Sequence, residues 1–168
     1  MRKIIQLMIA GLMIVSLNLN AQQDAKSFVK QYKKQDGFTV VSIGKPAMKL
    51  MSLFAKASDN EASQVISRVD AIQVLVCDSW NKTRNESFNN EALTFCDANR
   101  YDELIEVIEQ NETVKIFCKT EGESITGLII LTHSNHHDIA MVCLSGRFTA
   151  NDLQTITKSN GKHIAGLN

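Results

Sequence analysis

One stretch constrains the fold more than any other part of the chain: residues 125–148, I-T-G-L-I-I-L-T-H-S-N-H-H-D-I-A-M-V-C-L-S-G-R-F. Two apolar runs of strand length, 128–131 and 139–144, are separated by the polar tip S-N-H-H-D, and this pattern predicts a β-hairpin. Both runs are apolar at consecutive positions, which is typical of strands that are covered on both faces. We therefore expect a central sheet with helices on one side and a less obvious cover on the other.

The remaining periodicities predict an ordered series of helices and strands around this hairpin. Helices are expected at 22–37, 46–54, 58–69, 88–96 and 101–110, and after Thr149, which opens the variant capping box T-A-N-D. Strands are expected at 38–44, 72–77 and 114–119, in addition to the two hairpin strands. This order predicts the α+β class, with a mainly antiparallel five-stranded sheet and helices packed on one face as a two-layer sandwich.

Two of the predicted helices rest on apolar residues at helical spacing. In 46–54 the stripe Ala47, Leu50, Met51 and Phe54 is expected to face the sheet, with Met48 at its margin. In 101–110 the stripe is Leu104, Ile105 and Ile108.

The first 21 residues have the pattern of a secretory signal peptide. Arg2 and Lys3 precede a mainly apolar run over 4–17, and small Ala21 ends the polar tail that follows. The run is too short for a membrane anchor, which needs about 20 apolar residues. We expect cleavage near Ala21, a single α+β domain over 22–168, no stable membrane anchor, and a periplasmic or secreted location.

The charge balance argues against nucleic acid as a partner. The chain has 18 basic and 18 acidic residues, and loss of Arg2 and Lys3 would leave a net charge of −2. Nucleic-acid binding needs clustered Lys and Arg side chains, and the sequence has no such stripe.

The four cysteines, Cys77, Cys96, Cys118 and Cys143, do not have the spacing of a zinc site or of a disulfide framework. Three of them lie in or at the end of apolar strands, where a thiol behaves as a small buried hydrophobe. We expect buried thiols, although an exported location would permit disulfides.

The best candidate for chemistry is the hairpin tip, where His133, His136, His137 and Asp138 bring four metal-ligating side chains within six residues. Zinc and copper select such ligands. The alternative is a set of solvated turn histidines, since adjacent His136 and His137 would point to opposite sides of an extended chain. We favour the second interpretation, so we assign no metal, cofactor or catalytic residue and predict that the protein is not an enzyme.

Six segments carry a resemblance to a known family: F-T-V-V-S-I-G-K-P-A-M-K-L-M, V-D-A-I-Q-V-L-V-C, R-Y-D-E-L-I-E-V-I, T-V-K-I-F-C-K, I-T-G-L-I-I-L and L-S-G-R-F-T-A-N-D-L. Together they resemble the exported Bacteroidetes family called domain of unknown function 4252. The resemblance implies an envelope location and a compact α+β domain. It implies no activity, cofactor or catalytic residue. An envelope-stress or signalling role is associated with such relatives through neighbouring sigma-factor genes.

Two functions from different classes remain. The first is a non-enzymatic exported domain that binds another envelope protein, or a second copy of itself, through its sheet face or edge. The alternative is a metal-binding protein or metal-dependent enzyme that uses the cluster from His133 to Asp138.

Overall fold

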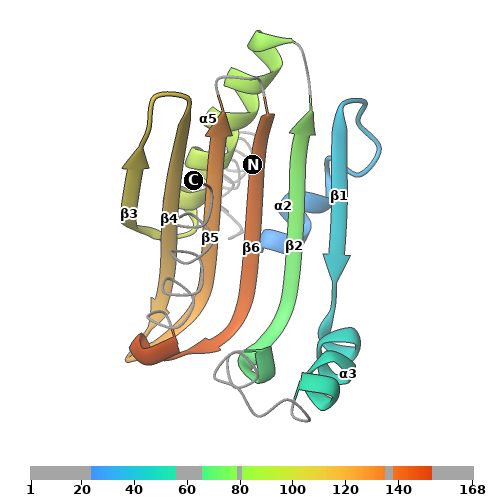
Figure 1. Ribbon diagram of the computed structural model, residues 1–168, viewed down its shortest axis with the longest axis vertical. Coiled ribbons are helices and arrows are strands. Elements are labelled where there is room, and N and C mark those ends of the chain that lie inside the picture. The colour runs from blue at the N-terminus through green and yellow to red at the C-terminus, as the bar shows by residue number, and fades with distance from the viewer. Residues whose placement is uncertain (1–23, 56–65, 79–80, 135–137, 153–168) are drawn as a thin grey trace, which may run out of the picture.

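The computed structural model describes residues 24–55, 66–78, 81–134 and 138–152. Its centre is an antiparallel six-stranded sheet in the order β1-β2-β6-β5-β4-β3 (Figure 1). The strands are β1 (Phe38–Ile43), β2 (Val69–Asp78), β3 (Asp102–Ile108), β4 (Glu112–Glu121), β5 (Ser124–Ser134) and β6 (Asp138–Phe148). The helices are α2 (Ala25–Lys30), α3 (Lys45–Ala55) and α5 (Lys82–Ala98). The predicted α+β class is confirmed, with six strands in place of five.

The predicted hairpin forms the centre of the sheet. Strand β5 pairs with β6, and β4 pairs with β5, so the three sequential strands make the expected antiparallel meander. Strand β2 joins the other side of β6, which places both hairpin strands in the interior of the sheet. Alternate residues of these strands lie on opposite faces of the sheet, and both sets are apolar, which gives the near-continuous apolar runs.

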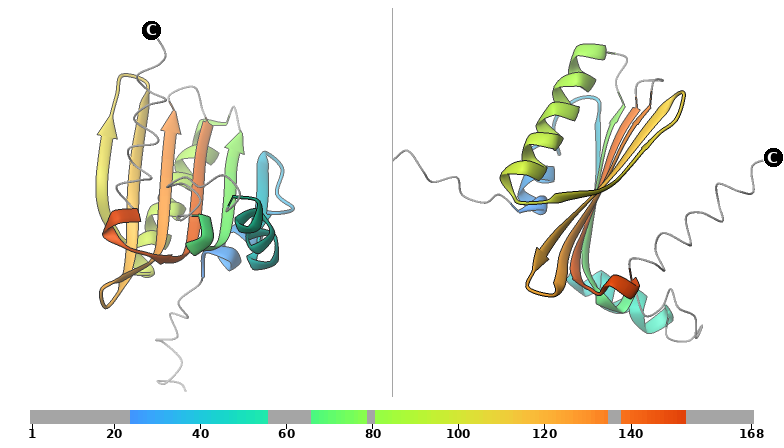
Figure 2. Two further views of the ribbon diagram at one scale, coloured as in Figure 1. Left: turned by 60° about the horizontal axis from the view of Figure 1, so that its bottom comes forward. Right: turned by 90° about the vertical axis from the view of Figure 1, so that its left-hand side faces the viewer.

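Helices α2 and α5 form a layer on one face of the sheet, as the edge-on view in Figure 2 shows. Helix α5 begins after Asn81, whose side chain accepts a hydrogen bond from the Arg84 backbone N–H at the N-cap. The helix predicted over 88–96 is confirmed within α5, and Phe88, Ala92 and Phe95 on its inner side are all buried. These side chains pack on Leu75, Ile129, Ile139, Met141 and Cys143 of the sheet to form the main core.

Helix α3 does not pack as its sequence pattern predicts. Its buried residue is Met48, which is 2% exposed and belongs to a second, smaller cluster with Leu128 and Phe148. The predicted stripe residues Leu50 and Met51 are exposed. The helix lies at one end of the sheet (Figure 1), and Met48 is the one buried residue among those of its side chains that the structure describes, which do not include Phe54.

The predicted helix over 101–110 is wrong, because residues 102–108 form strand β3 at the edge of the sheet. The pairing with β4 shifts register between Glu103 and Ile105, which leaves Leu104 as an extra residue. A bulge changes the phase of the apolar alternation, so Leu104, Ile105 and Ile108 take on the spacing of a helix. The prediction of helix for 58–69 is also wrong at Val69, which begins β2; residues 66–68 are helical, and 58–65 lie outside the described residues.

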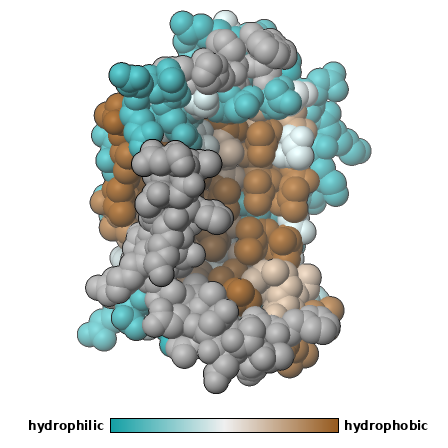
Figure 3. All heavy atoms as spheres, viewed as in Figure 1, coloured by the Kyte–Doolittle hydropathy of each residue, from teal (hydrophilic) through white to brown (hydrophobic). Residues whose placement is uncertain are grey.

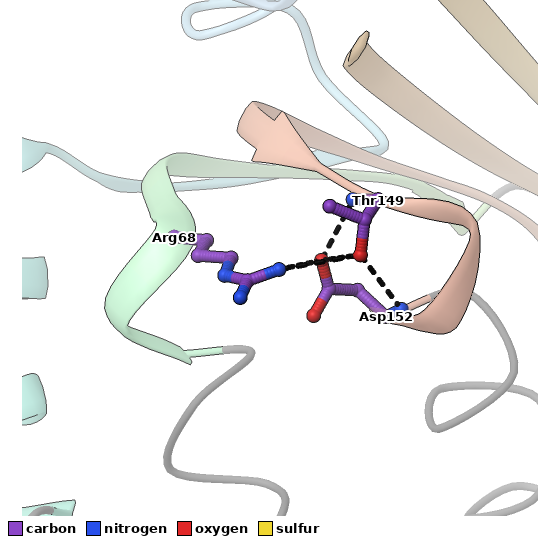
Figure 4. A network of polar contacts seen from close by, with 3 residues as sticks. All are labelled: Arg68, Thr149 and Asp152. Carbon is purple, nitrogen blue, oxygen red and sulfur yellow. Dashed lines mark hydrogen bonds and ion pairs between the residues drawn. The ribbon is translucent and has the colours of Figure 1, made fainter. Parts of the chain in front are cut away.

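The capping box predicted at Thr149 is confirmed (Figure 4). The Thr149 backbone N–H donates to Asp152 Oδ2 at 2.7 Å, and the Asp152 backbone N–H donates to Thr149 Oγ1 at 3.4 Å. The Arg68 guanidinium also donates to both side chains, to Thr149 Oγ1 at 3.3 Å and to Asp152 Oδ2. This network ties the end of β6 to the residues that precede β2.

All four cysteines are free and buried, as predicted. The proposed signal peptide lies outside the described residues. Within the described part of the chain, no helix has the length and apolar character needed to cross a membrane.

Candidate interaction surface

The sheet face opposite α5 is built from three cross-strand rows of six residues, which we call the open face. Strand pairing places Val41, Val74, Val142, Ile130, Ile116 and Ile105 in its central row. The two flanking rows are Ile43, Ile72, Leu144, Leu128, Cys118 and Asp102, and Thr39, Val76, Ala140, Thr132, Val114 and Val107. Asp102 and the two threonines are the polar members, so fifteen of the eighteen positions are apolar.

Sixteen of the eighteen residues of the open face are partly or fully exposed, and the other two, Leu128 and Cys118, are buried. Every residue of the central row is partly or fully exposed, including Val41 at 46% in edge strand β1. Helix α3 and the helical residues 66–68 cover one end of this face, where Met48 and Ile66 pack with Ile72, Leu128 and Leu144. Figure 3 shows hydrophobic side chains gathered in the middle of this view, over β6 and β2, and along the edge formed by β3.

The charged side chains of β3 and β4 lie mainly on the face that carries α5, whereas a solvated open face would be expected to carry them itself. On the helix side, Lys115 Nζ lies 3.0 Å from Glu103 Oε2 and 2.7 Å from Glu106 Oε1. The hydrogen bonds that Lys115 Nζ donates to Glu106 and then to Glu103 raise the pKa of Lys115, so this side chain keeps its charge. On the open side the same two strands present apolar residues, among them Ile105 and Val107. An edge strand that faced water on its open side would carry its charges there.

Helix α3 extends the apolar surface beyond the sheet. Leu50 is 59% exposed and Leu53 is 65% exposed, and Met51 between them is also exposed. Contiguous exposed apolar patches of more than a few hundred Å² are rare on monomeric soluble proteins and mark contact sites.

Local sequence explains why this face forms. Valine and isoleucine supply most of its residues, and β-branched side chains favour the extended backbone and pack well on a pleated surface. The alternate positions of β2 and β6 carry Leu75, Cys77, Ile139 and Met141 toward α5, where they are buried. Both sets are apolar, so each strand reads as one continuous run.

The structure places two members of the proposed metal cluster at the ends of the hairpin strands. His133 is near the end of β5, opposite Ile139, and Asp138 is the exposed first residue of β6, opposite Asp78. His136 and His137 lie outside the described residues. Among the residues that the structure describes, no three His, Cys, Asp or Glu side chains are grouped closely enough to hold a metal ion.

The thiols lie in environments that suppress reactivity. Burial raises the pKa of the Cys96 thiol to about 12, and burial with the neighbouring Cys96 raises the pKa of Cys143 to about 12. Burial also raises the pKa of Cys77, whose Sγ–H donates to Asn85 Oδ1 at 3.2 Å. A nucleophilic cysteine needs a lowered pKa and access to solvent. These three cysteines have neither property.

The hairpin sequence indicated that one face lacked a helical cover, but it did not reveal the extent of that face. Edge strand β3 and the exposed part of α3 were missed, since both were assigned a different packing. The alternation of Glu106 with Ile105 and Val107 is the signal that could have placed β3 in the sheet.

The fold and the surface define an α+β domain with one helix-covered sheet face and one accessible apolar face. The chain belongs to the family described as domain of unknown function DUF4252, whose family model matches residues 32–156. Comparison with curated proteins and with solved structures gave no match.

Proposed function

We propose that this protein is an exported, non-enzymatic domain of the cell envelope whose open face binds another protein. The observation that carries the proposal is the distribution of charge across β3 and β4. The charged residues Glu103, Glu106 and Lys115 lie on the side that carries α5, and the open side of these strands is apolar except for Asp102 and Glu112 at the strand ends. Covering an apolar surface of this kind is favourable by about 25 cal/mol for each Å² removed from water.

Export and an envelope location are supported by the leader pattern of Arg2, Lys3 and the apolar run that follows. A stress-response or signalling role for the bound complex would agree with the genetic setting that the family resemblance implies. A binding role agrees with the chemistry of the described residues, because all four thiols are buried and the carboxylates of β3 lie on the exposed surface of the strand.

Photocrosslinking in the cells that make the protein tests the proposal. A photoreactive amino acid at position 142 would project from the centre of the open face. The control position is 90, an exposed asparagine on α5 at the opposite side of the sheet. We expect a discrete adduct from position 142 and none from position 90. Equal or absent crosslinking from the two positions would overturn the proposal.

A further inference from the structure

We propose that the protein bound by the open face is a second copy of this chain, packed face to face about a two-fold axis parallel to the strands. This inference rests on the proposed function and names its partner. Three features of the described residues support it: the composition of the face, its size, and the charges at its two edges.

The composition of the open face makes it complementary to itself. A two-fold interface brings the same patch of both copies together, so any charge near its centre would oppose a like charge. The central row has no charged or hydrogen-bonding side chain, and Asp102 lies at the outer end of a flanking row. Two such sheets can pack about 10 Å apart with interdigitating side chains, as in β-sandwiches.

The size of the open face suits a stable dimer. Six strands about 4.8 Å apart, with three rows that each advance about 6.6 Å along the strand, give a flat area of roughly 570 Å². Side-chain relief increases the accessible area above this flat value, and Leu50, Met51 and Leu53 of α3 add to it. The total approaches the roughly 800 Å² per partner that specific interfaces bury.

The charges at the two edges of the sheet select one of two symmetric arrangements. Exposed basic residues lie beside edge strand β1: Lys33, Lys34, Lys45 and Lys49. Exposed acidic residues lie in and next to edge strand β3: Asp102, Glu109 and Glu112. Three residues have the opposite sign: Asp36 and Asp70 near β1, where Asp70 forms an ion pair with Lys45 at 3.0 Å, and Arg100 near β3. The β1 edge keeps an excess of basic residues, and the β3 edge keeps an excess of acidic residues.

A two-fold axis parallel to the strands places β1 of one copy over β3 of the other, so opposite charges meet at both edges. An in-plane axis perpendicular to the strands would place β1 over β1 and oppose like charges, which is destabilising. The pairing registers locate the charges along the strands. Phe38 and Ile108 lie in the same cross-strand row at one end of the sheet, so Lys33 and Lys34 of one copy would approach Glu109 and Glu112 of the other.

The molar mass of the purified protein tests the proposal. Size-exclusion chromatography with light scattering should give twice the mass of the denatured chain. Val142→Lys should raise the dissociation constant at least about 100-fold, because each copy would bury an unpaired charge. Val41→Lys, in edge strand β1 at an exposed position, should have the same effect if Val142→Lys fails to fold. Asn90→Lys on α5 is the matched control and should remain dimeric.

Charge reversal tests the orientation of the two copies. Lys33→Glu with Lys34→Glu should weaken the dimer about tenfold at low salt, and the further changes Glu109→Lys and Glu112→Lys should restore it. A monomeric wild-type protein, or a Val142→Lys variant that remains dimeric, would overturn the dimer. Failure of the charge rescue would overturn the strand-parallel axis.

The two proposals fail in distinguishable ways. The protein could be a monomer in solution and still form, from position 142 in cells, an adduct whose mass is not twice the chain mass. This result would overturn the proposal that the partner is a second copy, and it would support the binding function. An adduct of twice the chain mass would support both. Absence of any adduct from position 142 would overturn the binding function.

Discussion

Val74 and Val142 lie directly opposite each other in the β2·β6 pair, and both side chains are on the sheet face opposite α5. Val142 is also opposite Ile130 of β5, so the register of two strand pairs fixes the centre of the open face. A shift of one residue in either pair would turn these side chains toward α5. The interaction surface therefore depends on this register.

Engineered cysteines at these two positions test the register. Directly opposite residues have Cα atoms about 4.5–5.5 Å apart, within the range that a disulfide spans. We expect Val74→Cys with Val142→Cys to form a disulfide on mild oxidation, detected as a mass loss of two hydrogens on the peptide pair. The matched control is Val76→Cys with Val142→Cys, whose positions are diagonal and about 7–8 Å apart. Bridging in the control and not in the first variant would contradict the register.

The capping box at the end of β6 should make stability depend on acid pH. Burial raises the pKa of Asp152, but the hydrogen bonds from Thr149 and Arg68 outweigh this, so the pKa lies below its ordinary value of 3.8. A carboxyl group with a lowered pKa in the folded state stabilises the fold above its unfolded pKa. This contribution should be lost as the pH falls from about 4 through the folded pKa.

The variant Asp152→Asn isolates that contribution. It should lower the free energy of unfolding by about 1 kcal/mol at pH 7, the typical effect of losing a cap. The difference from the wild type should shrink as the pH falls through the lowered pKa of Asp152, because a protonated carboxyl group no longer makes this contribution. Urea denaturation at a series of pH values measures it, and a difference that grows toward acid pH would rule out the assigned role.

Gly146 lies where strand β6 passes very close to the backbone before β2. A Cβ atom at this position would come within 2.2 Å of the Arg68 carbonyl oxygen, a backbone atom that cannot rotate away. Gly146→Ala should therefore destabilise the protein by about 1–3 kcal/mol, the usual cost of overpacking. Gly44→Ala is the control, since its Cβ would meet nothing closer than Pro46 at 3.8 Å. Equal thermal stability of the two variants would show that the close approach is absent.

The buried thiols should be inert in the folded protein. All four cysteines are buried, and burial raises the pKa of Cys96 and Cys143 to about 12. We expect iodoacetamide at pH 8 to modify all four thiols in denaturant and to leave them largely unmodified under native conditions. Mass spectrometry counts the modified sites. Rapid native labelling of Cys96 or Cys143 would conflict with the described core.

Sequence patterns predicted the elements whose periodicity was undisturbed. The hairpin of β5 and β6, strands β1, β2 and β4, and helix α5 all have unbroken patterns, and each was confirmed. The capping box at Thr149 was also identified, because its two side chains act within a single turn. Such local features do not depend on distant contacts.

The failures arise where distant contacts decide the structure. The sequence predicts a helix at strand β3 because the extra residue Leu104 disrupts the strand alternation, whereas pairing with β4 determines the actual conformation. The position of helix α3 along the chain was predicted correctly, but its apolar stripe was predicted to face the sheet. Its contact through Met48 leaves Leu50 exposed, and no local pattern distinguishes these two packings.

The central claim, that the open face is covered by protein in the cell, is tested most directly by carbene footprinting, which leaves the face unaltered. Labelling of the peptides that contain Val142 and Ile130 should be several-fold lower in intact envelopes than after extraction into dilute solution. Labelling around Asn90 on α5 should be the same in both states. Equal labelling of Val142 in the two states would contradict the account.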